Sequence, residues 1–469
     1  MRRVFIWLLV IVFVSSIVVA GVACKEEAAE ETVQEEETSE EAAPAEEAEV
    51  TEGEKPFEGT TIKVITFQMG HQQTIGDLVP RFEEETGIDV VYDIIPYNDV
   101  REKMLTLSAA HSYEYDVLWL DTIWVPEFAN AGFLYDVSEW IERDWDEIDV
   151  DDFPENFWDY CLRYDDKWIG LPSSGHYGIY VYRKDLFEQF GLKPPESMKD
   201  QEEIARTLTT EIDGEQIYGT AFRYARGNYI ASDFCHFTGA YADYDNIFLG
   251  WFHPDMTPAF NEPAMLRALN DYFYYYENNL VPPGSENFEF PDIMNSFNQG
   301  TVATIATENW ACAPLVDPET SDFADSIGFY TPPGYLKEDG TIEWSPYSGG
   351  IFPFSISSDS PNKEAAWEFL KWASSKDIQE DYMAGEGVAY RLSVMEDPDM
   401  QAKYPWIEFL PKVIATGSYR PLIPEFAVIQ DIVGLELSRA LLGEISKEDA
   451  LKTINEKVTE VLDKAGYYE

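Results

Sequence analysis

The sequence predicts an α/β protein in which the strands of a mainly parallel sheet alternate with helices on both of its faces. Two observations predict this class. Short apolar runs rich in β-branched residues alternate with longer amphipathic segments over residues 57–465, and glycines stand where several of those segments would end as helices. The chain has 469 residues, of which 45% are hydrophobic, so it is long enough for two or three domains with a substantial core.

The first elements follow one another directly. Three short, apolar segments are typical of strands, and three longer segments between and after them are typical of helices. In chain order these elements are strand 61–67, helix 72–86, strand 89–95, helix 97–110, strand 116–120 and helix 124–132. Gly87 and Gly132 stand where helices would end. This β-α-β-α-β order predicts neighbouring parallel strands joined by helical crossovers.

The later part of the chain continues the alternation. The expected strands are 178–183, 301–307 and 350–357, and the expected helices are 185–190, one containing 293–299, 363–374, 429–442 and 447–465. Within 363–374, Ala366, Phe369 and Leu370 lie on one face of the predicted helix, which is typical of a helix packed on a sheet. No internal repeat of fixed period is present.

The N-terminus is predicted to be an export signal. Arg2 and Arg3 precede an apolar run, and the Gly21-Val22-Ala23-Cys24 segment resembles a bacterial lipobox, although Gly21 stands where Leu is usual. The resemblance implies a signal peptide at 1–24 and lipid attachment at Cys24. The alternative is an uncleaved membrane anchor, because 4–23 is long enough to span a bilayer. Both interpretations place the remaining chain outside the cytoplasmic membrane, in the periplasm or at the cell surface.

The chain is strongly acidic, with a formal net charge of -56. Residues 25–55 hold 14 acidic and 2 basic residues, and we expect 25–56 to be a disordered tether because it has little apolar surface to bury. Residues 25–55 contribute -12 to the net charge, and Arg2 and Arg3 contribute +2. The remaining residues 56–469 therefore still carry a net charge of -46. This charge excludes nucleic acid as a partner. A solvated acidic surface explains it, and a cation-binding site is the alternative.

The sequence favours a binding protein over an enzyme. The HExxH, GxSxG, P-loop and GxGxxG patterns are absent from it. Cys161, Cys235 and Cys312 are far apart and form no CxxC pair, so we expect small buried side chains, with at most one disulfide and neither a metal nor a cofactor. An opposed carboxylate pair, as in a glycosidase, would be expected by chance among 88 acidic residues.

Five segments, in the same order, resemble the extracellular solute-binding proteins of bacterial ABC sugar importers, the group that includes maltose-binding protein. They are FEEETGIDVVYD (82–93), YDVLWLDTIWVPEFANAGFLYDVSEWI (115–141), WIGLPSSGHYGIYVYRKDLFEQFGLKPPES (168–197), FNQGTVATIATENW (297–310) and SGGIFPFSISSDSPNKEAAWEFLKWASS (348–375). Arg183 stands where that family usually has Asn, and Ser197-Met198 where it usually has Thr-Trp. The resemblance covers roughly residues 57–465.

The resemblance implies a two-lobe, periplasmic-binding-protein-like (type II) fold in which neither lobe is contiguous. Lobe one would comprise 57–171 plus 330–378, and lobe two 176–325 plus 379–465, with crossovers near 170–175 and 330–334. A solute would bind in the cleft between the lobes, which would close around it. The implied partners are a carbohydrate and a membrane-bound ABC permease, and we expect a monomer.

Candidate binding residues follow from strand ends and from the resemblance. Asp121 follows the strand 116–120, at the edge where α/β sheets bind ligands, although it could instead cap the next helix. Gln68 and His71 follow the strand 61–67 at the same edge, and Trp124 lies one helical turn after Asp121. Trp124 could instead simply pack, and His71 could equally be an exposed loop residue.

The resemblance adds further candidates. It places Trp310 in the cleft as a face for sugar stacking, with Glu308 nearby, and it gives Arg391 a place facing the cleft unless that side chain forms a structural ion pair. Ser174 and His176 lie at the first predicted crossover. The segment Tyr347-Ser348-Gly349-Gly350 precedes a strand, and its glycines would let the backbone approach a solute, although a simple turn would use them too. From it we take Tyr347, Gly349 and Gly350 as candidates.

The sequence therefore predicts a lipid-anchored protein that captures an oligosaccharide or glycoside and delivers it to an ABC permease. The alternative is a polyamine or another cationic solute, held by Asp121, Glu308 and aromatic walls. A structural or adhesive lipoprotein without a small-molecule ligand is a further class.

Overall fold

The computed structural model describes residues 55–242, 248–344, 347–385 and 387–468, and side chains are described from residue 350 onward in the segment that begins at 347. The predicted signal peptide 1–24, its Cys24 and nearly all of the tether 25–56 lie outside the described residues. Residues 55–469 make up one structural unit. In the part of the chain that is described, no helix has both the length and the apolar character needed to cross a membrane.

One eight-stranded mixed sheet organises this unit, in the order β10-β6-β13-β3-β1-β2, with β14 beside β13 and β9 beside β6. Its strands are β1 (Thr61–Phe67), β2 (Asp89–Ile95), β3 (Val117–Trp119), β6 (Leu171–Arg183), β9 (Thr304–Glu308), β10 (Ile327–Tyr330), β13 (Tyr347–Ile356) and β14 (Ser418–Tyr419). Three two-stranded hairpins complete the described strands: β4 (Arg163–Tyr164) with β5 (Lys167–Trp168), β7 (Thr210–Ile212) with β8 (Glu215–Ile217), and β11 (Tyr335–Leu336) with β12 (Ile342–Glu343).

The prediction of a mainly parallel sheet is correct for only part of this sheet. β1 is parallel to β2 and β3, as the β-α-β-α-β order requires, but β13 is antiparallel to β3 and β6, and β6 is antiparallel to β9 and β10. The parallel pairing expected from the alternation of strands and helices is found for the first three strands. The remaining strands are brought together by long-range pairing, which leaves no local signature in the sequence.

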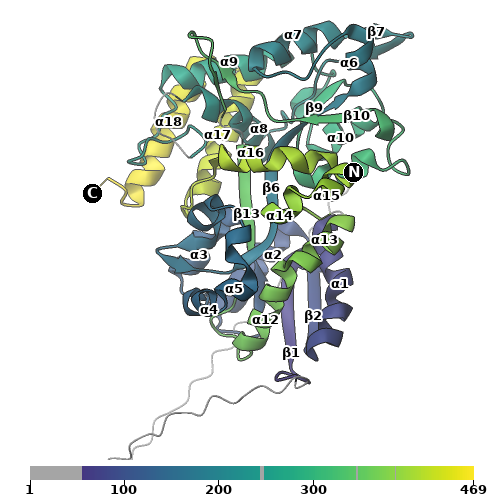
Figure 1. Ribbon diagram of the computed structural model, residues 1–469. Helices are drawn as coiled ribbons and strands as arrows, with labels where there is room; N and C mark the ends of the chain where they lie inside the picture. Colours follow the sequence, from purple (N-terminus) through teal and green to yellow (C-terminus); the bar gives the residue numbers. More distant parts are fainter. Residues whose placement is uncertain (1–54, 243–247, 345–346, 386, 469) are drawn as a thin grey trace, which may run out of the picture. The chain divides into compact units, whose positions relative to one another are not determined.

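β6 and β13 run between the two halves of this unit (Figure 1). β6 has 13 residues; its first part pairs with β13, and Gly178–Tyr182 pair with β9. The predicted crossover at 170–175 and the predicted strand at 178–183 are therefore one continuous strand. In Figure 1, β1, β2 and α1 lie at one end of this strand pair, and β9, β10, α7 and α9 lie at the other.

Helices cover the sheet at both ends. The longer ones are α1 (Gly70–Thr86), α2 (Tyr97–Ala109), α7 (Met198–Leu208), α8 (Asn228–Tyr241), α9 (Pro263–Glu277), α10 (Phe290–Asn298), α12 (Lys363–Ser374), α13 (Lys376–Ala384), α17 (Phe426–Leu441) and α18 (Lys447–Lys464). The shorter ones are α3 (Val125–Asn130), α4 (Ser138–Arg143), α5 (Trp145–Ile148), α6 (Lys184–Phe190), α11 (Ala313–Val316), α14 (Leu392–Met395), α15 (Pro398–Lys403) and α16 (Leu410–Ala415).

Local sequence signals place several of these elements correctly. β1, β2 and α12 have the predicted bounds. α1 ends at Gly87, which adopts the left-handed conformation (φ 75°) and donates its N–H to the carbonyl of Glu83. Cys161, Cys235 and Cys312 are free and buried, as predicted.

The described core consists of two large clusters of buried apolar side chains and a small third one. One large cluster contains the apolar residues of β1, β3 and α12, and the other contains those of α8, α9, α17 and α18. The predicted lobe boundary at 378 falls inside α13, a single helix that packs against both α1 and α12. The two discontinuous lobes and their other bounds stay a prediction.

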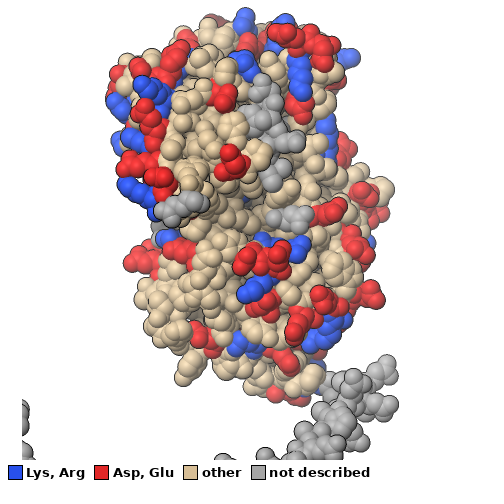
Figure 2. All heavy atoms as spheres, turned by 90° about the vertical axis from the view of Figure 1, so that its left-hand side faces the viewer, with Lys and Arg blue, Asp and Glu red and all other residues tan. Residues whose placement is uncertain are grey.

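Acidic side chains are distributed over the surface. On the face shown in Figure 2, Asp and Glu lie among Lys and Arg over the upper and lower parts of the molecule and do not gather in a single patch. Among the described residues, no group of three or more His, Cys, Asp or Glu side chains is arranged to hold a metal ion. This distribution favours a solvated acidic surface as the explanation of the net charge.

Candidate functional site

A cavity of about 370 Å³ lies where the carboxyl end of β1 and the turn after β3 face the middle of β6, the end of β9 and the first turns of α8 and α10. Its walls therefore come from segments far apart in the sequence. The lining residues are Phe67, Gln68, Met69, Tyr97, Trp119, Asp121, Ile123, His176, Arg223, Asn228, Tyr229, Ser232, Phe290, Pro291, Glu308, Trp310, Phe352, Arg420 and Gln430.

Aromatic rings form much of the wall. Phe67 and Trp119 pack with ring centroids 4.1 Å apart, and Trp119 lies 5.4 Å from Phe352. Trp310 and Phe290 form a second pair at 4.4 Å with an angle of 32° between the ring planes. Such rings offer flat apolar faces to the C–H groups of a sugar or polyol.

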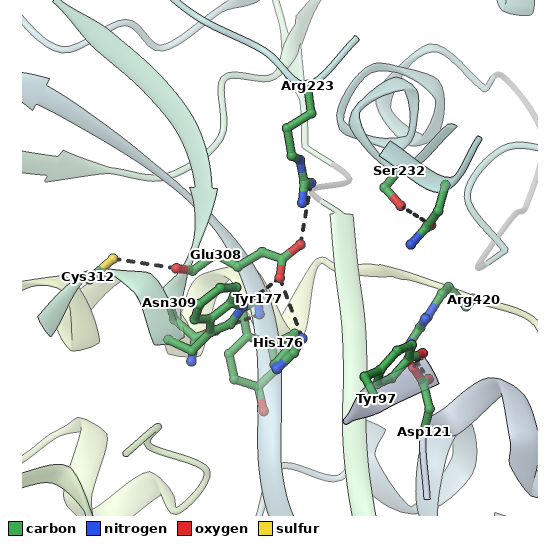
Figure 3. A network of polar contacts seen from close by, with 12 residues as sticks. Tyr97, Asp121, His176, Tyr177, Arg223, Ser232, Glu308, Asn309, Cys312 and Arg420 are labelled. Carbon is green, nitrogen blue, oxygen red and sulfur yellow. Dashed lines mark hydrogen bonds and ion pairs between the residues drawn. The ribbon is translucent and has the colours of Figure 1, made fainter. Parts of the chain in front are cut away.

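Asp121 anchors one side of the cavity (Figure 3). Its Oδ1 accepts a hydrogen bond from Arg420 Nη2 at 2.8 Å, and its Oδ2 accepts one from the Tyr97 hydroxyl at 2.7 Å. Oδ1 also accepts the backbone N–H of Ile123, so Asp121 caps the short 3-10 helix Thr122–Trp124. The predicted helix cap is therefore confirmed, and Asp121 also lines the cavity, while its contact with a solute stays a prediction.

Glu308 anchors the other side. In Figure 3 its carboxylate points between the guanidinium of Arg223 and the imidazole of His176. Oε1 lies 3.5 Å from Arg223 Nη2, and Oε2 lies 3.5 Å from His176 Nδ1. Oε2 also accepts a hydrogen bond from Trp310 Nε1 at 2.7 Å, which fixes the orientation of the indole. Glu308 is 8% exposed, so these partners replace the water that the charge has lost.

The charges that line the cavity are balanced. Asp121 is paired with Arg420, and Glu308 with Arg223, so two carboxylates face two guanidinium groups. Arg223 also forms an ion pair of 2.6 Å with the fully buried Asp233, behind the lining. Burial raises the pKa of the Asp233 carboxyl in spite of the opposing effect of Arg223. Asp121 and Glu308 therefore each face a guanidinium group, and Glu308 shares its arginine with Asp233.

Neutral polar side chains complete the lining. Gln430 Nε2 donates to Ser232 Oγ at 3.2 Å, and Ser232 Oγ donates to Asn228 Oδ1 at 2.8 Å. Asn228 and Ser232 lie in α8, and Gln430 lies in α17. Together with Gln68 they offer both donors and acceptors, which is what hydroxyl groups require of a binding site.

Two histidines with little solvent exposure lie close together, with ring centroids 5.7 Å apart: His176, which lines the cavity, and the buried His71. Burial lowers the pKa of His71 well below its ordinary value, and a positive charge on the neighbouring His176 would lower it further. Burial also lowers the pKa of His176, with further lowering by the nearby charges of Arg420 and Arg223. Both imidazoles are therefore neutral at pH 7, and the Nε2 atom of each is buried without a hydrogen-bond partner.

The structure brings five of the predicted site residues together around the cavity: Gln68, Asp121, His176, Glu308 and Trp310. His71 lines a smaller neighbouring cavity with Trp310. Their contact with a solute stays a prediction. Gly349 lies within β13, and the side chain of Tyr347 is outside the part of the chain whose side chains are described.

Three predicted site residues are buried in other surroundings. Trp124 packs behind the lining, with ring centroids 5.2 Å from Tyr97 and 5.7 Å from Trp119. Ser174 is fully buried within β6. Gly350 has φ 97°, and a Cβ there would lie 3.0 Å from Cys161 Sγ, so local packing is sufficient reason for the glycine.

The expectation that Arg391 faces the cleft is wrong, because its guanidinium is used within the protein. Nε donates to the Ser374 carbonyl at 2.7 Å, and Nη2 donates to the Ile148 carbonyl at 2.8 Å. Nη1 forms an ion pair with Asp152 at 3.2 Å, and the residue is only 2% exposed. The structural ion pair, the competing use considered for this residue, is the one observed.

Sequence reasoning missed both arginines of the cavity. Arg223 lies in an irregular segment before α8, and Arg420 follows the two-residue strand β14. Neither segment has a periodic pattern, and neither residue is near one of the five family-like segments. The only available signal was the rule that a buried carboxylate needs a cationic partner, applied to Asp121 and Glu308.

Comparison with known proteins agrees with this geometry. A model of the bacterial extracellular solute-binding protein family matches residues 70–380. The chain belongs to this family. Its members bind solutes, in agreement with the prediction of a binding protein that is not an enzyme and with a location outside the cytoplasmic membrane.

Several solved structures and curated relatives are similar to this chain, among them proteins with polyols bound. The fold is similar to an ABC transporter solute-binding protein from Agrobacterium radiobacter K84 in complex with ribitol (TM-score 0.74, 27% identity, 87% of this chain and 100% of that one). It is also similar to one from Agrobacterium vitis S4 with bound D-mannitol (TM-score 0.72, 25% identity, 87% and 100%). The mannitol-binding protein of Pseudomonas aeruginosa is 26% identical over 409 residues, which are 82% of this chain and 89% of that protein. These matches confirm the periplasmic-binding-protein fold.

Replacing Arg391 tests its structural role. We expect Arg391→Met to lower the free energy of unfolding by about 3–5 kcal/mol, because Asp152 would lose its cationic partner and the carbonyls of Ser374 and Ile148 would lose a donor. Arg391→Lys should lower the free energy of unfolding less than Arg391→Met does, because lysine keeps the positive charge beside Asp152. Denaturant unfolding measures both values, and solute affinity of the folded fraction should not change. A loss of affinity with unchanged stability would contradict the assignment.

The buried histidines predict a pH dependence of stability. Their pKa values are lower in the folded state than the ~6.5 of an unfolded chain, so the unfolded chain binds protons first as the pH falls. The stability that the neutral histidines contribute is fully present above about pH 6.5. It decreases as the pH falls from there toward the pKa of each histidine in the folded state. As the pH falls below about 6.5, each histidine should therefore lower the free energy of unfolding.

The measurement is the free energy of unfolding at about pH 7 and about pH 5 for the wild type, His71→Asn and His176→Asn. Each variant should lose less stability on acidification than the wild type does. The control is His111→Asn, because the side chain of His111 is 78% exposed. If the buried and exposed variants respond alike, the two histidines are not the cause.

Proposed function

We propose that this protein captures a small, neutral, polyhydroxylated solute, an acyclic polyol or a monosaccharide, and delivers it to an ABC permease. The proposal includes the lipid anchor at Cys24 and the acidic tether expected from the sequence, which would keep the protein near its permease. The observation that carries the proposal is the cavity itself, where aromatic faces surround two arginine–carboxylate pairs.

The balance of charge favours a neutral solute. A polyamine would need carboxylates free to accept ammonium groups, but Asp121 is paired with Arg420, and Glu308 shares Arg223 with Asp233. Breaking the Asp121–Arg420 pair in this nearly dry site would cost several kcal/mol. A hydroxyl group can instead donate to the carboxylate and accept from the guanidinium while the pair stays intact.

The size of the cavity favours a small solute. About 370 Å³ is near the lower end of the ~300–1,000 Å³ range of ligand pockets. The oligosaccharide expected from the sequence would need a longer groove, so we narrow the proposal to molecules of about five or six carbons. The ribitol and D-mannitol complexes of similar proteins support this size class.

Calorimetric titration with ribitol, D-mannitol, maltose and spermidine tests the function. We expect heat of binding with at least one of the two polyols and with neither maltose nor spermidine. Trp310→Ala should weaken polyol binding at least tenfold, because a stacked ring is lost; one aromatic contact is worth at least ~1.4 kcal/mol once its buried area is included. Trp145→Ala is the matched control, since Trp145 is 36% exposed and does not line the cavity.

Binding of spermidine alone would favour a cationic solute, and binding of maltose alone would favour the oligosaccharide class. Equal losses in the Trp310 and Trp145 variants would show that the effect is general destabilisation and would remove Trp310 from the site. Each of these outcomes contradicts the proposal.

A further inference from the structure

A second cavity, of about 110 Å³, adjoins the first one. Its lining residues are Met69, Gly70, His71, Phe290, Met294, Trp310, Ala311 and Pro314. Met69, Phe290 and Trp310 line both cavities, so the two spaces share a wall. We call this space the side cavity.

The shared wall is held in a defined orientation. Trp310 and Phe290 pack at 4.4 Å, and Trp310 Nε1 donates to Glu308 Oε2 at 2.7 Å. Glu308 is itself held between Arg223 and His176. The hydrogen bond to Glu308 therefore fixes the indole that borders the main cavity, and the same indole borders the side cavity. A solute that packs on Trp310 in the main cavity would therefore contact a side chain that also borders the side cavity.

The lining of the side cavity is chemically different from that of the main cavity. Its side chains are two thioethers, two aromatic rings, a proline and an alanine, with His71 as the one titratable group among the lining residues. His71 is 1% exposed and neutral, and its Nε2 has no hydrogen-bond partner. An ordered water needs two to four polar partners, and this lining offers one side chain that can act as such a partner. The space therefore suits an apolar group better than water.

We propose that the side cavity is a subsite for an apolar substituent carried by the polyol or sugar, such as an O-alkyl group or a deoxy terminus of one to three carbons. This inference rests on the proposed function, because it needs a polyhydroxylated solute in the main cavity. The upper limit follows from volume: at about 30 Å³ for each water-sized group, 110 Å³ holds about three such groups.

Affinity should rise with each carbon until the side cavity is full. Burial of one CH₂ group contributes ~0.8 kcal/mol, which corresponds to about fourfold tighter binding. Methyl, ethyl and propyl ethers should therefore bind progressively more tightly than the parent polyol. A hexyl ether, which exceeds the volume, should gain nothing over the propyl ether.

The experiment is calorimetric titration of the protein with ribitol, D-mannitol and their 1-O-methyl, 1-O-ethyl, 1-O-propyl and 1-O-hexyl ethers. Met294→Phe tests the location, because Met294 lines the side cavity and is absent from the lining of the main one. The larger ring should fill the space and abolish the gain from the alkyl group, while affinity for the parent polyol stays within twofold of the wild type. Met294→Leu conserves volume and should keep the gain.

The outcomes separate this inference from the proposed function. If the parent polyols bind and their ethers bind equally well or more weakly, the side cavity is not a subsite. The proposed function would still stand in that case. Ethers that bind although the parents do not would support the subsite as a required part of recognition. If no polyol and no ether binds, both the subsite and the proposed polyol function are contradicted. A gain that persists in Met294→Phe would place the alkyl group elsewhere and overturn the inference.

Discussion

The antiparallel pairing of β6 with β13 is the constraint on which the site depends. β6 pairs with β13 through its first part and with β9 through its second part, so one continuous strand serves both halves of the sheet. The register places Gly178 opposite Glu308, which brings that carboxylate beside His176. β13 in turn pairs with β3, and Asp121 follows β3 by two residues. The two carboxylates of the cavity are thus positioned by strands hydrogen-bonded to the same central pair.

The second constraint is the low polarity of the surroundings. A carboxylate that is 5–8% exposed loses most of its hydration and requires compensation. Arg420 and Arg223 supply it, each from a segment that the sheet or α8 brings alongside. The same ion pairs also determine which groups face the cavity. They present strong hydrogen-bond donors and acceptors, while the charges of the lining side chains sum to zero. The stability of the site and the neutral solute that we propose for it therefore rest on the same pairs.

The parts of the structure that local sequence determines were predictable. β1, β2 and α12 have the predicted bounds because their apolar periodicity and flanking residues are local properties. Asp121 and Gln68 were found because the carboxyl ends of adjacent parallel strands meet at one edge. Arg223, Arg420 and Gln430 were not found, because their positions depend on contacts between segments far apart in the chain. Arg391 was misassigned, since resemblance alone did not reveal its partners Ile148 and Asp152.

The central claim is that the cavity is built for a neutral polyhydroxylated solute, and a matched set of three ligands tests it most directly. Ribitol, ribonate and 1-amino-1-deoxyribitol have nearly the same size but carry no charge, a negative charge and a positive charge. Calorimetric titration near neutral pH should give the tightest binding for ribitol, with the two charged analogues at least tenfold weaker. Tighter binding of either charged analogue would contradict the account, because the arginine–carboxylate pairs would then not balance the site.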